Sequence, residues 1–348
     1  MTKLDFINKD LTIKDPPDFT VVSTFSGCGG SSTGYVWAGG KVLLAVEWDN
    51  NAVETYKLNY PTTDVYHGDI AKLAVDEVLE RTGLNVGELD IFDGSPPCQG
   101  FSTAGKRNLD DERNQLFREY VRLLRGLKPK VFVMENVSGM VKGKMKILFA
   151  EILTELKASG YKVSAKLLNA MYLGVPQSRQ RMIFIGVRDD LGIEPSHPKP
   201  QTRGIPPRQA LYNVGEPDEN EIRVMPEWLR QAAQYIDAGN YNHQSVADAF
   251  MKIKGKKSGS INTKLLSWNR VSCTLVKQEI ADTGIIHPSR DRYLTVPEMK
   301  RIGSFPDSYI LTGSRKDRVM RIGNSVPPRM MQYIAEHIKD NILSKLNT

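Results

Sequence analysis

Cysteine is scarce in this chain of 348 residues. The three cysteines, Cys28, Cys98 and Cys273, lie far apart, without a CxxC pair and without histidines at ligand spacing. Disulfide frameworks and structural zinc sites need matched sets of such residues, so the sequence argues against both. The scarcity fits a protein of a reducing compartment.

Long hydrophobic runs are missing as well. No apolar stretch of the sequence approaches the roughly 18 residues that a membrane span requires. The opening MTKLDFINKDLTIKDPPDF has neither the apolar core nor the cleavage site of a signal peptide. We therefore expect a soluble intracellular protein. Its net charge of +7 favours a polyanionic partner only weakly, because many basic proteins bind nothing acidic.

Short apolar runs alternate with a helical pattern in the first half of the chain. Four compact aliphatic runs, typical of buried parallel strands, occupy residues 21–25, 41–48, 89–95 and 130–136. Between the last two runs, one helical face carries Leu116, Tyr120, Leu123, Leu124 and Leu127. Residues 161–169 and 181–188 indicate further strands. This alternation predicts a doubly wound α/β sheet.

The pattern changes after Asp189. Residues 189–290 are irregular, proline-rich at first, and show little helical periodicity, which indicates a second, smaller domain. Within them, residues 265–276 (LLSWNRVSCTLV) are predicted to form a strand. The final segment opens with Pro327 and Pro328, which suit a first helical turn. Its apolar stripe, expected to pack on the first domain, consists of Met331, Ile334, Ile338 and Ile342. The predicted domains are residues 1–188 plus 318–348, and residues 189–317.

A glycine-rich turn, FSGCGGSSTG (25–34), follows the first predicted strand. Its glycines allow close approach of a ligand to the backbone. Glu47 ends the next strand, where a carboxylate can accept hydrogen bonds from ribose hydroxyls. Trp48 offers a flat face for adenine, and Asp69 ends a third predicted strand. The turn alone also suits an ordinary strand–turn–helix junction and is not a clean GxGxxG. With these three residues it favours a cofactor that contains adenosine.

The segment GSPPCQGFS (94–102) is more specific. Two prolines stiffen the chain directly before Cys98, which stands at the carboxyl end of a strand, the edge at which open α/β sheets bind ligands. A nucleophilic Cys98 needs positive charge or a helix terminus nearby to favour the thiolate. An inert loop cysteine is the alternative.

Three charged residues follow on later segments. Glu135, in MENV (134–137), ends the next strand at the same edge as Cys98 and is either a candidate proton donor or a solvated carboxylate. In QSRQR (177–181), Arg179 and Arg181 are alternate residues, which point the same way on extended backbone. One or both can present a guanidinium to a base carbonyl or a phosphate. Surface salt bridges are their alternative.

The chain resembles the cytosine-5 DNA methyltransferases. Six blocks occur in the order of that family's motifs, namely FSGCGG, PPCQGFS, MENV, QSRQR, RYLTVPEMKRIGSFPD (292–307) and RIGNSVPP (321–328). The resemblance extends from about Val21 to the C-terminal helix, except between about Asp189 and Ser289, where members differ because this region selects the target sequence. It implies a Rossmann-like methyltransferase sheet, with residues 189–317 as a target-recognition domain.

The resemblance also implies a role for each matching residue. Cys98 attacks carbon 6 of the cytosine, and Glu135 engages N3 and the exocyclic amine. Arg181, with Arg179 nearby, binds O2. S-adenosylmethionine provides the methyl group and becomes S-adenosylhomocysteine, and no metal is needed. The residues expected around this cofactor are Phe25, Gly27, Gly29, Glu47, Trp48, Asp69, Ile70, Pro97, Asn324 and Ser325. Cys28 and Cys273 match no catalytic position and are interpreted as structural.

DNA contacts are expected in two places. The target cytosine must be flipped out of the duplex at a cost of a few kcal/mol, and in the family the segment matching residues 102–117 closes over the DNA. Here the predicted contacts are Gln99, Ser102 and Arg113. The basic cluster MKIKGKKSGS adds Lys254, Lys256 and Lys257, which are predicted to contact phosphates. An ordinary solvated connection and a solvated charged face are the alternatives.

Three other functions compete with this interpretation. A tRNA cytosine methyltransferase of the same family shares Cys98, Glu135 and the cofactor residues, but the roughly 100 residues after QSRQR leave room for a DNA-reading domain. An inactive DNA-binding regulator lacks the cysteine or the glutamate. A Rossmann oxidoreductase leaves PPCQGFS and MENV unexplained. We expect a monomer that binds double-stranded DNA and no membrane. We expect it in the cytoplasm, associated with the nucleoid, as a restriction–modification or orphan methylase of a prokaryote or phage.

Overall fold

The computed structural model describes residues 4–97, 115–141, 145–215, 219–241, 243–255, 263–277 and 284–346. The chain divides into two compact units. The sheet unit comprises Leu11–Asn169, Gln180–Lys199 and Met330–Thr348, and the second unit comprises Met1–Asp10, Ala170–Arg179 and Pro200–Arg329. The assignment of residues 189–317 to target recognition stays a prediction.

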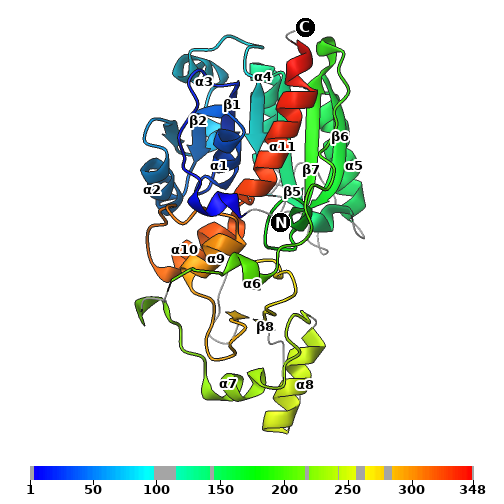
Figure 1. Cartoon of the computed structure of the whole chain (residues 1–348). Coiled ribbons are helices and arrows are strands. Elements are labelled where there is room, and N and C mark those ends of the chain that lie inside the picture. Colours follow the sequence, from blue (N-terminus) through cyan, green and yellow to red (C-terminus); the bar gives the residue numbers. More distant parts are fainter. Residues whose placement is uncertain are drawn as a thin grey trace. The chain divides into compact units, whose positions relative to one another are not determined.

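A seven-stranded sheet forms the centre of the sheet unit, with the strand order β3-β2-β1-β4-β5-β7-β6 (Figure 1). The strands are β1 (Phe19–Thr24), β2 (Gly40–Glu47), β3 (Asp64–His67), β4 (Ile91–Gly94), β5 (Val131–Val137), β6 (Tyr161–Asn169) and β7 (Gln180–Arg188). Neighbours from β3 to β5 pair in parallel, whereas β7 is antiparallel to both β5 and β6. The α/β sheet is confirmed. The chain order reverses between β1 and β4, and open sheets bind ligands outside the carboxyl ends of strands at such a point.

One predicted strand end is wrong. β3 ends at His67, so Asp69 does not end it. Asp69 is instead the N-cap of the 3₁₀ helix η2 (Ile70–Lys72), and its Oδ1 accepts a hydrogen bond from the Ala71 N–H at 3.0 Å. An aspartate that caps a helix satisfies an N–H that has no partner within the helix, which ends the extended backbone before it.

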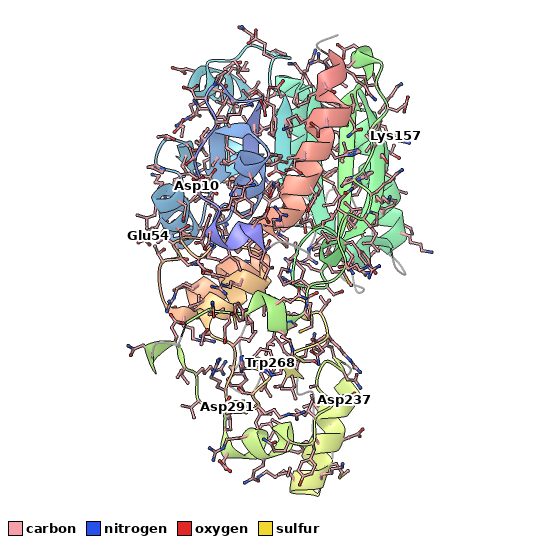
Figure 2. All side chains as sticks on the ribbon, in the orientation of Figure 1. Asp10, Glu54, Lys157, Asp237, Trp268 and Asp291 are labelled. Carbon is pink, nitrogen blue, oxygen red and sulfur yellow. The ribbon has the colours of Figure 1, made fainter. Side chains whose placement is uncertain are left out.

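Three helices share a core with the strands. They are α3 (Val75–Thr82), α4 (Gln115–Leu127) and α5 (Met145–Lys157), and Lys157 marks the end of α5 in Figure 2. The helix predicted before Lys128 is confirmed as α4, whose Tyr120 stacks on Phe92 of β4 with 4.8 Å between ring centroids. Among the described residues, no helix is both long enough and apolar enough to cross a membrane.

Helices α1 (Gly30–Trp37) and α2 (Asn50–Asn59) follow β1 and β2, and α11 (Pro328–Asn341) ends the fold. In Figure 1, α11 runs across one face of the sheet. It begins at Pro328, and the predicted apolar stripe is confirmed, because all four side chains are fully buried. The Nζ of Lys339 donates to the carbonyl of Ala38 at 3.0 Å, which ties α11 to the end of α1.

The second unit contains more helix than the sequence predicted. Its helices are α6 (Pro207–Ala210), α7 (Glu227–Ala233), α8 (His243–Lys254), α9 (Val296–Ile302) and α10 (Arg315–Asn324). The expectation of little helical structure in residues 189–290 is therefore wrong for α7 and α8. These helices pack on each other through a small core that includes Leu229, Ala232, Val246 and Ala249. Small alanines give a weak hydrophobic signal in the sequence, although they allow close packing.

The strand predicted over residues 265–276 is also wrong in extent. β8 (Lys264–Leu265) pairs there in parallel with β9 (Ile285–Ile286), and Ser272 forms an isolated bridge with Gln177. The rest is held by single contacts: the Ser178 N–H donates to the carbonyl of Ser272 at 2.8 Å, and the Leu275 N–H donates to Oε1 of Gln177 at 2.8 Å. The alternation of apolar and polar residues, which predicted a strand, thus belongs to an extended segment most of which lies outside any sheet.

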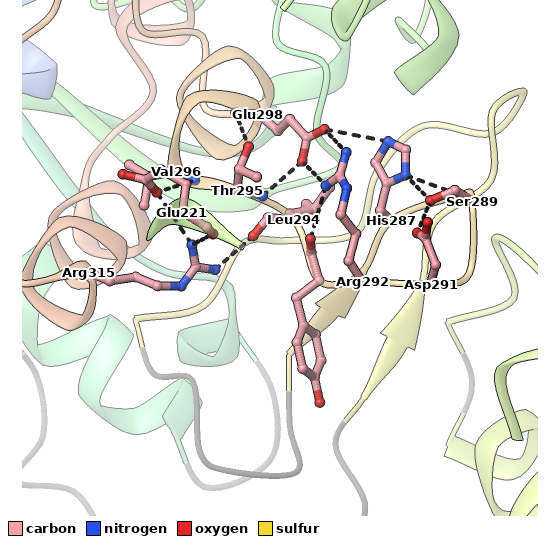
Figure 3. A network of polar contacts seen from close by, with 11 residues as sticks. Glu221, His287, Ser289, Asp291, Arg292, Leu294, Thr295, Val296, Glu298 and Arg315 are labelled. Atoms are coloured by element: carbon pink, nitrogen blue, oxygen red, sulfur yellow. Dashed lines mark hydrogen bonds and ion pairs between the residues drawn. The ribbon is translucent and has the colours of Figure 1, made fainter. Parts of the chain in front are cut away.

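A polar network fixes the block RYLTVPEMKRIGSFPD at the start of α9 (Figure 3). Arg292 donates through two nitrogens to both carboxylate oxygens of Glu298, at 2.8 and 2.9 Å. Thr295 and Glu298 form a capping box, in which the Thr295 N–H donates to Glu298 at 2.8 Å. The capping box satisfies the N–H groups of Thr295 and Glu298 at the start of the helix. Arg292 and Glu298 therefore stabilise the fold of this block.

Candidate active site

The glycine-rich turn joins β1 to α1 in a backbone conformation that side chains disfavour. Phe25, Gly27 and Gly29 have φ angles of 54°, 56° and 94°, and Gly29 is the N-cap of α1. A Cβ atom added to Gly27 would meet no atom within 4 Å. The left-handed backbone, rather than a lack of space, therefore requires glycine there. The open space beside the turn allows a ligand to approach the backbone.

Glu47 ends β2, as predicted, and its carboxylate holds this turn. Its Oε2 accepts a hydrogen bond from the Gly27 N–H at 2.7 Å. Its Oε1 accepts from the N–H groups of Trp48 and Asp49, at 2.9 and 3.0 Å. A carboxylate has roughly four acceptor positions. One position therefore remains for a ligand hydroxyl beside the turn.

The other predicted cofactor residues of the sheet unit lie close to Glu47 in the fold. Trp48 follows it directly and is 78% exposed, so a face of its indole ring is accessible. The Gly68 N–H donates to the carbonyl of Glu47 at 3.0 Å, which brings the following Asp69 to the end of β2. Ile70, the next residue, is buried. An accessible indole and a carboxylate beside a glycine turn suit a nucleoside.

The segment that leads to Cys98 leaves β4 beside β5. Gly94 pairs with Met134 in the sheet. The residues that follow Gly94 and those that follow Met134 therefore lie side by side at the same edge of the sheet. Asn136 donates through Nδ2 to the carbonyl of Pro96 at 3.2 Å. Sequence reasoning missed Asn136, although it stands beside Glu135 in MENV. Pro97 is exposed. Cys98, Gln99, Ser102 and Arg113 lie outside the described residues.

Glu135 and Arg181 form an ion pair between β5 and β7. The Nε of Arg181 lies 2.6 Å from Oε1 of Glu135, and their side chains are 15% and 12% exposed. Because β7 is antiparallel to β5, Arg181 lies opposite Val137. Glu135 stands two residues before Val137 and so points to the same face of the sheet, within reach of Arg181. The guanidinium holds the carboxyl group of Glu135 at the edge of the sheet from which Pro96 and Pro97 continue after β4.

Arg179 belongs to the second unit and has different partners from Arg181. Its guanidinium is buried and donates to the carbonyls of Leu275 at 3.2 Å and Gly323 at 2.9 Å. The QSRQR block is thereby joined to RIGNSVPP, the block that contains Asn324 and Ser325. Asn324, the last residue of α10, is exposed, and Ser325 donates to the carbonyl of Arg321 at 2.7 Å.

Among the predicted DNA-contacting lysines, Lys254 lies in the last turn of α8 and is exposed. On the same helix, the Nζ of Lys252 lies 5.3 Å from the centre of the Tyr235 ring, a cation–π distance. Lys256 and Lys257 lie outside the described residues. The described part of this cluster thus combines exposed positive charge with an aromatic side chain.

A buried carboxyl lies one residue before Gly94, and sequence reasoning missed it. Asp93 is 2% exposed, with Oδ2 accepting from the Ser23 hydroxyl at 2.9 Å and Oδ1 accepting from the Tyr35 hydroxyl at 3.0 Å. Burial raises the pKa of Asp93 to about 7, against the lowering effect of these two donors, and the charge of Glu135 raises it further. In the sequence, Asp93 stands among apolar strand residues, which is the one available signal.

This raised pKa predicts how stability depends on pH. Unfolded Asp93 releases its proton near pH 4 and folded Asp93 near pH 7, so the folded protein binds more protons between these values. The free energy of unfolding is therefore expected to fall as the pH rises from 4 to 7, by up to roughly 4 kcal/mol from this group. Asp93→Asn should lack this decrease. Urea unfolding at several pH values measures the free energy of unfolding of both proteins. If this free energy depended on pH in the same way in both, the prediction would be contradicted.

Comparison with known proteins adds three findings. The family model of the C-5 cytosine-specific DNA methylases matches residues 19–340. The chain is 34% identical to the Type II methyltransferase M1.HphI of Haemophilus parahaemolyticus, over 92% of this chain and 86% of the relative. It is 33% identical to the Type II methyltransferase M.DdeI of Desulfomicrobium norvegicum, over 91% and 88% of the two chains.

Solved structures agree in fold. A putative DNA modification methyltransferase encoded within a prophage of E. coli superposes with a TM-score of 0.72 at 25% identity, over 95% of this chain and all of the other. The DNMT2 protein of Spodoptera frugiperda superposes with a TM-score of 0.66 at 21% identity, over 95% of this chain and 100% of the other. The second likeness shows the fold alone.

Proposed function

Since the chain belongs to the family of C-5 cytosine-specific DNA methylases, we propose that its active site is built from Cys98, Glu135 and Arg181, at the carboxyl ends of β4 and β5 and the amino end of the antiparallel β7. The pairing of Gly94 with Met134 carries this proposal, because it brings the segment before Cys98 and the Glu135–Arg181 pair to one edge of the sheet. The methyl donor binds at the neighbouring ends of β1 and β2.

Cys98 is the nucleophile in this proposal. Its thiolate adds to carbon 6 of the cytosine, which makes carbon 5 nucleophilic enough to accept a methyl group. The carbon-5 proton is then lost and the sulfur of Cys98 leaves as carbon 5 and carbon 6 regain their double bond. The two prolines and the hydrogen bond from Asn136 to Pro96 hold the chain that leads to Cys98.

Glu135 and Arg181 hold the base. The carboxyl group of Glu135 engages N3 and the exocyclic amine. It stabilises the negative charge that develops in the ring during attack, which favours addition at carbon 6. Arg181 fixes that carboxyl at 2.6 Å and presents the rest of its guanidinium to O2. Arg179 donates to two backbone carbonyls of its own unit, so its part in this proposal is to position the QSRQR block.

S-adenosylmethionine, the methyl donor used in the family, supplies an electrophilic methyl group on its sulfonium. The residues present fit it. Gly27 leaves open space beside the turn, Glu47 keeps an acceptor position for a ribose hydroxyl, and Trp48 presents an accessible ring for adenine. Phe25, Gly29, Asp69, Ile70 and Pro97 complete the proposed contacts in the sheet unit. Asn324 and Ser325 are the contacts from RIGNSVPP.

We assign reading of the DNA sequence to residues 189–317. The similarity to Type II methyltransferases supports double-stranded DNA as the substrate and a role in restriction–modification. The exposed Lys254 and the pair of Lys252 with Tyr235 support phosphate contacts along α8. The proposed contacts outside the described residues are Gln99, Ser102, Arg113, Lys256 and Lys257. We further propose a monomer that acts in the cytoplasm on nucleoid DNA.

Tritium transfer tests this function. The protein is incubated with labelled S-adenosylmethionine and either unmethylated DNA or tRNA, and the DNA product is sequenced after bisulfite treatment. We expect label in DNA only, at cytosines within one short motif. Label in tRNA alone would assign the protein to the RNA-modifying relatives, and label in neither would contradict the proposal.

A further inference from the structure

The carboxyl group of Asp93 joins three elements beside the active site. Asp93 pairs with Ser23 across β4 and β1, and the Ser23 hydroxyl donates to it. Tyr35, the second donor, lies on α1, the helix that begins at the glycine turn. The strand that leads to Cys98 is therefore bound to the strand and the helix on both sides of that turn.

The opposite face of β4 is fixed as well. Successive strand residues point to opposite faces, so Gly94 faces away from Asp93. A Cβ at Gly94 would lie 2.5 Å from Oγ1 of Thr24 and 2.6 Å from the ring of Tyr120. The Thr24 hydroxyl also donates to the carbonyl of Asp93 at 3.0 Å. The end of β4 thus has neighbours on both faces and little freedom to shift.

A carboxyl group is an unfavourable choice for this position if packing is its sole purpose. The ionisable groups that act on it from the neighbouring elements are Glu135 on β5, Tyr35 on α1, Tyr56 on α2 and Tyr120 on α4. One is a carboxylate and the others are phenols, whereas a buried charge is stable when it is paired with an opposite charge. Such departures from ordinary core composition concentrate at functional positions.

We propose that Asp93 is a positioning residue for methyl transfer, which acts through Tyr35 and Ser23 to set the segment Gly94–Pro97 in register with the glycine turn. The inference rests on the proposed function, in which Cys98 follows that segment and the methyl donor binds at that turn. A displacement of about 1 Å between reacting groups costs on the order of a hundredfold in rate. Loss of these bonds therefore affects turnover more than binding.

Tyr35→Phe tests the proposal, because it removes one donor and keeps the buried ring. We expect kcat per bound S-adenosylmethionine to fall roughly tenfold, while KM for S-adenosylmethionine and for DNA changes less than about twofold. Asp93→Ala, which removes both bonds, should lower kcat at least as much. Asp93→Asn retains an acceptor for Tyr35 and can donate to Ser23, so it should keep kcat within about threefold. Binding stoichiometry from equilibrium dialysis corrects for any unfolded fraction.

Tyr161→Phe is the matched control, since its buried hydroxyl also loses one bond, to the carbonyl of Pro129 at 2.9 Å, at the other end of the unit's strands. It should leave kcat unchanged. Normal turnover per bound S-adenosylmethionine in both Tyr35→Phe and Asp93→Ala would overturn the proposal, whether or not stability falls. Wild type and Cys98→Ser are assayed in parallel. Activity in Cys98→Ser would instead show that the proposed nucleophile is wrong.

Discussion

Cys98→Ser is expected to lower methyl transfer to DNA by at least about a thousandfold, the largest effect of any single substitution in this chain. A thiol ionises near pH 8.5 and is intrinsically nucleophilic, whereas a serine hydroxyl is almost entirely protonated at neutral pH. Serine is nearly the same size, so DNA and S-adenosylmethionine should still bind. The measurement is tritium transfer, with binding of both ligands determined separately.

Cys273→Ala is the matched control for this substitution. Cys273 is a free thiol in the second unit and is buried, and burial raises its pKa to about 11. A thiol with this pKa remains protonated at neutral pH and makes a poor nucleophile. We expect Cys273→Ala to retain methyl transfer within about threefold. Full methyl transfer by Cys98→Ser would contradict the assignment of Cys98 as the nucleophile. Loss of methyl transfer in a folded Cys273→Ala protein would contradict it as well.

Glu135→Gln is expected to lower kcat by about a hundredfold or more, in the range of lost acid–base catalysis. Glutamine keeps the shape of the side chain but carries no charge and can take up no proton. In the unsubstituted protein the guanidinium of Arg181 lies 2.6 Å from the Glu135 carboxylate. The substitution leaves this guanidinium without its charged partner. Arg181→Lys should lower kcat roughly tenfold, because an ammonium lacks the planar set of donors that can bind the carboxylate and O2 together.

A double-mutant cycle tests whether the two residues act together. If they do, the double variant should lose much less activity than the product of the two single losses, as is usual for groups that act as a unit. Asp190→Asn is the matched control, because Asp190 pairs with Arg188 at the other end of β7, at 2.7 Å. It should leave kcat unchanged. Independent, multiplicative losses for Glu135→Gln and Arg181→Lys would show that the ion pair has no joint role in the reaction.

Local patterns were sufficient to predict most elements of the sheet unit. Residues 161–169 form β6 with the predicted bounds, and Glu47 ends β2. These predictions succeed because a continuous apolar run in β2, and alternating apolar and polar residues in the edge strand β6, are both typical of strands, and polar residues mark where they end. The extended segment 265–276 and the helices α7 and α8 escaped the same reasoning. Their periodicity is weak, and their structure depends on contacts with residues far along the chain.

The order of the motif blocks, the parallel strands up to β5 and the choice of the proposed reactive residues follow from the sequence itself. Each depends on residue types and on spacing along the chain. The tertiary structure alone decided that β7 is antiparallel, that Arg181 pairs with Glu135 while Arg179 binds the carbonyl of Gly323, and that Asp93 has a pKa near 7. Pairing partners and burial depend on segments that are distant in sequence. The free energy of ionising a side chain, and hence its pKa, depends on all the neighbours that replace water around it.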